Sequence, residues 1–210
     1  MLESPPHEHT AEPPAAPQAE GAPNETTGRL ARQEPRFDRV AGRGIGKEGV
    51  IRAAEMDSRS LQETFAPESV CFGCGPKNDK GLRIRSFAES DDACVCVWRP
   101  EAHHLAFPGV LNGGICGALL DCHSNWTAAW HLMRRDGAPL LPCTVTAEFA
   151  VTLRRPTPLD VDLVVRARIF GADRDRATVD AQIEAGGKVT AACRGVFVAV
   201  KEGHPAFHRW

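Results

Sequence analysis

A pair of glycines followed by an aspartate is the pattern with the clearest chemical use. Gly113 and Gly114 precede a long apolar repeat, and Asp121 lies within it in the segment LLDCH. Free amides at a helix start can stabilise an oxyanion, and glycine lets a flat substrate come close. A partly buried carboxylate has a raised pKa and can act as a general base or nucleophile. The simpler alternatives are a packing turn for the glycines and a solvated helix face for Asp121.

The spacing places the glycines and the aspartate too far apart to act together within one chain. Asp121 follows Gly114 by seven residues, so the two lie within about 20° in azimuth but roughly 10 Å apart along a helix axis. The reacting atoms must lie ~3 Å from both the base and the oxyanion donor. Two antiparallel helices related by a twofold axis could bring the glycines of one chain to the aspartate of another. The sequence therefore predicts a site shared by two copies of the chain.

The hydrophobic pattern predicts one long helix and several strands. Apolar residues at helical spacing form one stripe from Ile115 to Met133, and Gly137 follows as a stop signal. The period then changes to two, with odd-numbered residues on one face over 145–153 and Thr146 on the other. Further strands are predicted at 84–87, 93–98, 161–169, 177–183 and 189–200.

The order of these elements predicts the fold class. Because no crossover helix separates the later strands, neighbouring strands should pair as antiparallel hairpins in one sheet. The long helix must then bury its apolar stripe against that sheet. We therefore predict an α+β domain in which a curved antiparallel β-sheet wraps around one long central α-helix.

Three segments resemble a known family. CFGCGPKNDKGLRI (71–84), HLAFPGVLNGGICGALLD (104–121) and TAEFAVTLRRPTPLDVDLVVRARI (146–169) are similar to the hotdog-fold acyl-CoA thioesterases of the phenylacetate-pathway (PaaI-like) type. The resemblance covers about residues 68–201. It implies the hotdog fold and hydrolysis of the thioester between an acyl group and coenzyme A or acyl carrier protein. It also implies a homodimer or homotetramer, with each active site between two subunits and no metal.

The resemblance also assigns roles to residues. It implies that Asp121 is the catalytic carboxylate, that Gly113 is the oxyanion-hole glycine, and that Thr146 positions water or the carboxylate. Gly114 is a second candidate donor to the oxyanion. The family usually has histidine before the glycine pair, whereas Asn112 stands here. Asparagine is a strong helix N-cap, so the helix start is expected to remain sound.

Four residues are predicted to contact the substrate. Asn112 lies at the helix start, and His104 matches a loop histidine that is common in the family and would line the mouth of the site. Arg154 and Arg155, with Arg166 and Arg168 as further candidates, could hold the coenzyme A phosphates through their guanidinium groups. The alternatives are a surface role for His104 and ordinary strand-edge solubility for the arginines. The coenzyme A thioester is expected as substrate, and no cofactor is predicted.

Two other functions remain open from the sequence. The first is a noncatalytic acyl-CoA-binding or acyl-carrier-binding hotdog protein that has lost efficient turnover. The second is a hotdog enzyme with a different reaction, such as dehydration, which commonly uses a histidine where Asn112 stands.

The cysteines give weaker signals. Cys71 and Cys74 form a C-x-x-C pair without a second pair, so a zinc site would need ligands from elsewhere, such as His103 or His104, and none is predicted. Thiol catalysis by Cys116 or Cys122 with His123 or His131 is conceivable. Cysteines on an apolar helix face are more often core residues, and the two histidines are expected on the helix surface.

Composition narrows the remaining possibilities. The 210 residues carry a net charge of -2, so there is no basic excess to bind nucleic acid. No apolar run is long enough to cross a membrane and no signal peptide is evident, so a cytoplasmic protein with reduced thiols is expected. Residues 1–55 are rich in proline and lack apolar periodicity, which predicts disorder. The catalytic domain is predicted at 56–203, with a tail at 204–210.

Overall fold

The computed structural model describes residues 59–207. The predicted disorder of residues 1–55 lies outside this part of the chain, as does the end of the predicted tail at 208–210. None of the helices within the described residues combines the length and the apolar character needed to cross a bilayer.

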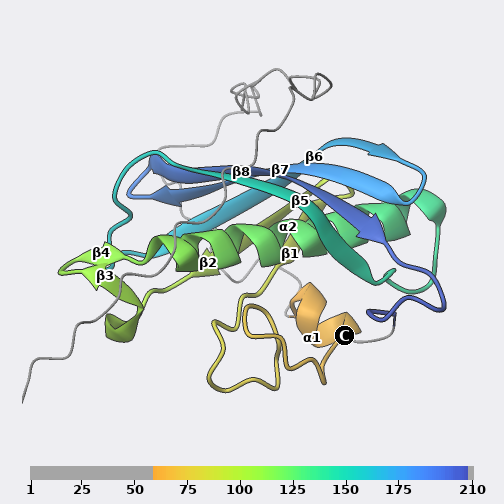
Figure 1. Ribbon diagram of the computed structural model, residues 1–210, viewed down its shortest axis with the longest axis horizontal. Coiled ribbons are helices and arrows are strands. Elements are labelled where there is room, and N and C mark those ends of the chain that lie inside the picture. Colours follow the sequence, from red (N-terminus) through yellow and green to blue (C-terminus); the bar gives the residue numbers. More distant parts are fainter. Residues whose placement is uncertain (1–58, 208–210) are drawn as a thin grey trace, which may run out of the picture. The chain divides into compact units, whose positions relative to one another are not determined.

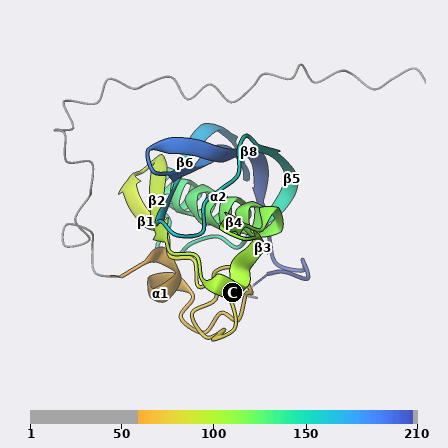
Figure 2. The ribbon, with the colours of Figure 1, turned by 90° about the vertical axis from the view of Figure 1, so that its left-hand side faces the viewer.

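Six antiparallel strands form one sheet in the order β1-β2-β6-β7-β8-β5. Its strands are β1 (Phe87–Ser90), β2 (Ala93–Trp98), β5 (Thr144–Leu153), β6 (Leu163–Asp173), β7 (Arg176–Ala185) and β8 (Lys188–Ala199). A separate ladder of β3 (Leu105–Phe107) and β4 (Val110–Leu111) precedes the long helix α2, which spans Gly113–Asp136. The curved sheet wraps around α2 (Figure 1 and Figure 2), which confirms the predicted α+β architecture.

The first predicted strand is wrong in position. The pattern predicted a strand at 84–87, whereas β1 begins at Phe87. Ile84 is fully buried, and its amide donates to the Gly73 carbonyl at an N···O distance of 2.9 Å. The apolar character of Ile84 therefore reflects its place in the core, where the loop around Gly73 holds its backbone.

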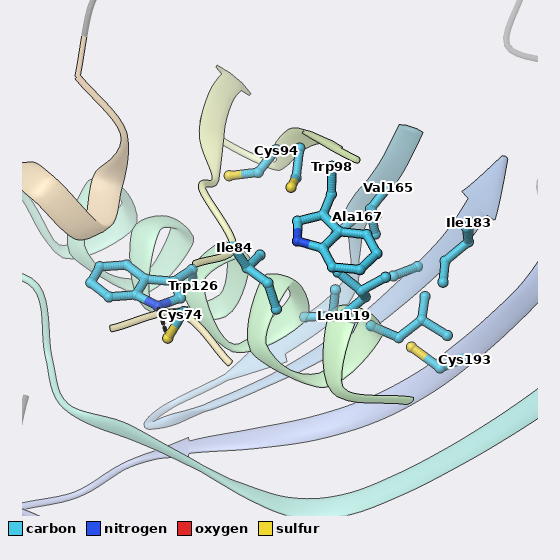
Figure 3. Close-up of a cluster of buried hydrophobic side chains, with 14 of the residues drawn as sticks. Cys74, Ile84, Cys94, Trp98, Leu119, Trp126, Val165, Ala167, Ile183 and Cys193 are labelled. Atoms are coloured by element: carbon cyan, nitrogen blue, oxygen red, sulfur yellow. Dashed lines mark hydrogen bonds between the residues drawn. The ribbon is translucent and has the colours of Figure 1, made fainter. Parts of the chain in front are cut away.

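Helix α2 buries one face against the sheet. Leu119, Leu120 and Ala128 have no exposed surface. Alternate residues of β6 and β7 belong to the same core cluster, namely Leu163, Val165, Ala167, Val179, Ala181 and Ile183. Figure 3 shows Val165, Ala167 and Ile183 near Leu119 of the helix. Each buried Leu, Ile or Val contributes roughly 1.5–3 kcal/mol relative to an exposed one, so this layer is a main source of stability. The helix ends at Gly137, whose φ of 60° is the left-handed cap that the sequence predicted.

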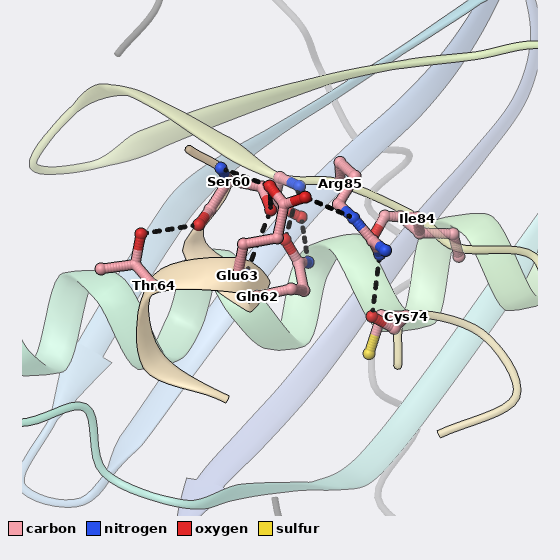
Figure 4. A network of polar contacts seen from close by, with 8 residues as sticks. Ser60, Gln62, Glu63, Thr64, Cys74, Ile84 and Arg85 are labelled. Carbon is pink, nitrogen blue, oxygen red and sulfur yellow. Dashed lines mark hydrogen bonds and ion pairs between the residues drawn. The ribbon is translucent and has the colours of Figure 1, made fainter. Parts of the chain in front are cut away.

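A short helix, α1 (Leu61–Phe65), is tied to the segment that precedes β1. Ser60 and Glu63 form a complete capping box at its start. The Glu63 carboxylate also lies 3.7 Å from the Arg85 Nε atom, and the Arg85 guanidinium donates to the Cys74 carbonyl at 3.2 Å (Figure 4). Polar contacts therefore connect α1 to the loop that carries the C-x-x-C pair.

A buried histidine links α1, β2 and α2. The His123 Nε2 atom lies 3.1 Å from the Cys94 carbonyl, which can only accept, so Nε2 donates and Nδ1 accepts from the Ser86 hydroxyl at 2.8 Å. Gln62 donates to the same hydroxyl at 3.0 Å and accepts from the Ser86 amide at 2.8 Å. Burial lowers the pKa of His123 to about 4, so the ring is neutral near pH 7. The expectation of a surface position is thus wrong for His123.

We predict that His123→Ala destabilises the fold strongly. The change opens a cavity and leaves the Ser86 hydroxyl and the Cys94 carbonyl without their partner, so the free energy of unfolding should fall by roughly 2–5 kcal/mol. Urea denaturation near pH 7 measures this loss. His103→Ala is the control, because the His103 side chain is 71% exposed and should change stability little. Equal stabilities of the two variants would contradict the structural role of the network.

Candidate functional site

The start of α2 leaves one glycine amide available to a ligand. The Asn112 side chain caps the helix and accepts from the Gly114 amide at 2.8 Å, as the sequence predicted. The Gly113 amide belongs to the first turn, where no intrahelical carbonyl can accept it. No acceptor for it is found among residues 59–207. Of the two predicted oxyanion donors, the geometry therefore favours Gly113, because the Gly114 amide is occupied.

His104 contacts Asn112, the residue that caps this helix start. Its carbonyl accepts from the Asn112 amide at 2.9 Å, and its Nδ1 atom accepts from the Glu101 amide at 2.9 Å. The ring is buried and lies 5.0 Å from the Trp98 ring, centroid to centroid. Burial lowers the pKa of His104, with a further contribution from neighbouring His103. Within this chain His104 therefore holds the backbone on both sides of the loop that precedes α2.

Arg154 and Arg155 lie at the glycine end of α2. The Leu153 side chain reaches Gly113 so closely that a Cβ added there would lie 2.9 Å from the leucine Cδ1 atom. Arg154 and Arg155 follow directly, with exposed side chains, and their amides donate to the Thr190 carbonyl at 2.8 and 3.1 Å. Neither guanidinium group has a hydrogen-bond or ion-pair partner among residues 59–207, so both can contact a ligand near Gly113.

Arg166 occupies a different place. Its guanidinium pairs with Glu89 at 2.8 Å and lies 3.9 Å from a Glu184 oxygen. Arg166 is therefore engaged with its neighbours in the sheet, and the candidate role in phosphate binding finds no support in these contacts.

Asp121 meets Thr146 where helix α2 borders the edge strand β5. The Thr146 hydroxyl donates to the Asp121 carboxylate at 2.8 Å. Burial raises the pKa of Asp121, while the hydrogen bond from Thr146 opposes the rise. A carboxylate with these neighbours is oriented, partly desolvated and still accessible. This is the arrangement that a general base or a nucleophile needs.

A β-bulge gives Thr146 this orientation. Thr146 pairs with Phe197 and Glu148 with Val196, so the register shifts between them. Before the bulge, Thr144 and Thr146 hydrogen-bond to residues of α2. After it, odd-numbered Leu153 approaches the same helix. The strict alternation predicted for residues 145–153 is therefore wrong at this point.

The structure does not bring Gly113 and Asp121 together within one chain. They are eight residues apart on the same helix, which corresponds to about 12 Å along its axis. A single α2 helix therefore cannot present both groups to one reacting carbon, which must lie ~3 Å from each.

A cluster of three cysteines adjoins Asp121. The sulfur atoms of Cys71, Cys74 and Cys122 all lie within 4.8 Å of one another. Hydrogen bonds from the Cys122 and Cys74 thiols lower the pKa of Cys71. The sequence shows only the C-x-x-C pair, because nothing in the spacing indicates that a helix residue far along the chain lies beside it.

The alternative of a catalytic Cys–His pair finds no support. Both ring nitrogens of His123 are engaged with Ser86 and Cys94. His131 pairs with Asp92 at 2.8 Å, and the Cys116 sulfur lies 3.6 Å from the Thr157 hydroxyl.

Comparison with known proteins agrees with this architecture. Residues 108–192 match the family model described as Thioesterase superfamily. This segment contains the start of α2, Asp121 and Thr146. Over this segment, the predicted resemblance to thioesterases is confirmed. No curated protein matches the chain.

Solved structures show the same fold at low sequence identity. A Haemophilus influenzae thioesterase is 17% identical, with a TM-score of 0.52, over 62% of this chain and 90% of its own. The E. coli PaaI protein of the phenylacetic acid degradation operon is 18% identical, with a TM-score of 0.51, over 60% and 88%. A further thioesterase superfamily protein is 24% identical, with a TM-score of 0.50, over 59% of this chain, which spans 60% of that protein's length.

We predict that Asn112→Ala lowers the free energy of unfolding by about 1 kcal/mol, because the first turn of α2 loses its side-chain cap. Asn112→Ser keeps a capping oxygen and should remain close to wild type. Urea denaturation of the three proteins under identical conditions measures the difference. If the alanine and serine variants were equally stable, the hydrogen bond to the Gly114 amide would contribute nothing to the helix start.

Proposed function

We propose that the protein hydrolyses the thioester of an acyl-CoA, or of an acylated carrier protein, at a site formed between two chains. The observation that carries the proposal is the Asp121 carboxylate, oriented by Thr146 at the open edge of the sheet. The match to the thioesterase superfamily supports this reaction class. Coenzyme A enters as part of the substrate, and the chemistry uses only groups of the protein.

In the proposed reaction Asp121 acts either as a general base or as a nucleophile. Asp121 takes a proton from water, whose oxygen bonds to the carbonyl carbon while the Gly113 amide of the partner subunit donates to the oxyanion. The C–S bond then breaks and the proton passes to the leaving thiolate, giving a carboxylic acid and a free thiol. Alternatively, Asp121 attacks the carbon itself, the C–S bond breaks and the thiolate leaves with the anhydride formed. Water then hydrolyses the anhydride to the carboxylic acid and the Asp121 carboxylate, and the proton released goes to the thiolate. Single turnover in heavy-oxygen water distinguishes the two routes, because only the anhydride route can place solvent oxygen in Asp121.

The edge strand supports a two-chain site. Among the described residues β5 pairs only with β8, so its other edge offers unpaired backbone groups to a second chain. Val151 and Leu153 on this strand are 38% and 57% exposed. Antiparallel pairing of two β5 edges would set two α2 helices side by side in opposite directions. The partner subunit's Gly113 would then face Asp121, with its Arg154 and Arg155 beside the same site.

The alternative reactions have less support. Dehydration commonly relies on a histidine at the position of Asn112, whose side chain here caps the helix. The neighbouring His104 accepts a backbone hydrogen bond through one ring nitrogen. A noncatalytic binding protein would retain affinity for acyl-CoA without releasing thiol, which the assay below separates from hydrolysis.

We predict that Asp121→Asn abolishes most of the thioesterase activity. The amide is close in shape but cannot accept the proton or attack the carbon, so turnover should fall by roughly 10²- to 10⁴-fold. Thiol release from short-chain, long-chain and aromatic acyl-CoAs measures the effect. Thr146→Ser is the matched control, since it keeps the hydroxyl. Wild-type rates in Asp121→Asn would refute the assignment, and tight acyl-CoA binding by a wild-type protein without turnover would favour the binding protein.

We predict that Gly113→Pro lowers turnover by roughly 10²- to 10³-fold, because it removes the proposed oxyanion donor. Proline is well tolerated at the first position of a helix, and Asn112 already has the extended backbone that proline requires before it (φ -62°, ψ 131°). Gly113→Ala is the matched control, because it brings the same crowding against Leu153 but keeps the amide. Equal losses in both variants would show that crowding, rather than the lost donor, is responsible.

Mixing the two inactive variants tests whether the site is shared. In a dimer of one Asp121→Asn chain and one Gly113→Pro chain, one of the two sites keeps both groups intact. Random reassembly should therefore restore roughly a quarter of the wild-type activity. The absence of any recovery, with mixed dimers demonstrated by differential tagging, would place both groups of each site in the same chain.

A further inference from the structure

We propose that Cys71, Cys74 and Cys122 bind a zinc ion through three thiolates, with solvent water as the fourth ligand. Their sulfur atoms all lie within 4.8 Å of one another. Zinc–sulfur bonds of about 2.3 Å in a tetrahedron place ligand sulfurs ~3.8 Å apart, so small side-chain rotations suffice to close the site. The proposal does not depend on the thioesterase reaction.

Glycines allow the loop that carries Cys71 and Cys74 to approach helix α2 closely. A Cβ at Gly73 would overlap the Cys122 sulfur, so only glycine lets the C-x-x-C turn come this close to α2. A Cβ at Gly75 would lie 2.5 Å from the Cys71 amide nitrogen, and the Gly75 amide donates to the Cys71 carbonyl at 2.9 Å. Two glycines thus make the tight turn that presents both sulfurs of the pair to Cys122.

A hydrogen-bond donor of helix α2 is directed at the sulfur atom of Cys74. The Trp126 indole N–H donates to the Cys74 sulfur at 3.2 Å (Figure 3). Donors of this kind hold metal-bound thiolates in other proteins, where they orient the ligands and tune the metal.

The loop is also held in place by other contacts. The Arg85 guanidinium donates to the Cys74 carbonyl at 3.2 Å, and the Ile84 and Leu82 amides donate to the Gly73 and Phe72 carbonyls at 2.9 and 2.8 Å. These hydrogen bonds hold the turn against the segment that precedes β1. A preformed, rigid set of ligands favours binding, because little ordering remains when the ion enters.

The ligand set selects the metal. Three thiolates suit zinc and other thiophilic ions, whereas Mg²⁺ and Ca²⁺ prefer oxygen ligands. Within residues 59–207 no other His, Cys, Asp or Glu offers a ligand atom close to all three sulfurs. Cys71 is exposed, so water can complete the tetrahedron from its side. A disulfide would use only two of the sulfurs and leave the third without a role.

Metal analysis of the full chain, purified without chelators, tests the site. We expect about one zinc per chain in the wild type, and its loss in Cys71→Ser and Cys122→Ser. Cys143→Ser is the matched control, because Cys143 lies outside the cluster, and it should keep the metal. Titration with Co²⁺ should give thiolate-to-metal charge-transfer absorption in the wild type and the control, but not in the two cluster variants.

Three results would overturn the proposal. The first is a wild-type protein that contains no zinc after expression with added zinc and that gives no charge-transfer band with Co²⁺. The second is retention of the metal by both Cys71→Ser and Cys122→Ser. The third is a disulfide within the cluster, which would lower the intact mass before reduction by two hydrogens relative to the fully reduced chain. If Cys122→Ser fails to fold, the exposed Cys71→Ser and the wild-type measurements decide.

Discussion

The hydrogen bond between Thr146 and Asp121 depends on which side of strand β5 the Thr146 side chain faces. Side chains alternate along a strand, so Thr146 and Leu153 would face opposite sides of a regular β5. The bulge after Thr146 inserts one residue and turns both side chains toward α2. The same strand can therefore hold the carboxylate near one end and cover Gly113 near the other. Bulges beside active sites commonly redirect a side chain in this way.

Local sequence signals predicted the parts of the fold that depend on local physics. The apolar stripe, the Asn112 cap and the Gly137 stop define α2 because each acts within a turn or two of the helix. The pairing of Asp121 with Thr146 followed from family resemblance, since no spacing rule reveals it. The bulge, the burial of His123 and the approach of Cys122 to Cys74 arise from tertiary packing. Ile84 misled the strand assignment for the same reason, because burial alone does not distinguish a strand from a clamped loop.

Asn112 determines which amides are available at the start of α2. Its side chain accepts from the Gly114 amide and so leaves Gly113 as the donor at this helix start. A single preorganised donor can still provide a substantial part of oxyanion stabilisation. The cap also fixes the first turn, since Asn112 is held in turn by the His104 carbonyl. The same contacts of Asn112 therefore stabilise the helix start and orient the Gly113 amide.

The cysteine cluster and the carboxylate lie on the same turn of α2. Cys122 follows Asp121 directly, so any constraint on the Cys122 side chain also limits rotation of that turn of α2. A zinc ion bound to Cys71, Cys74 and Cys122 would join the loop to the helix at the turn that carries Asp121. Such a link would act on the orientation of the carboxylate without touching the substrate. Removal of the metal would then loosen the same turn that Thr146 holds from the other side, through β5.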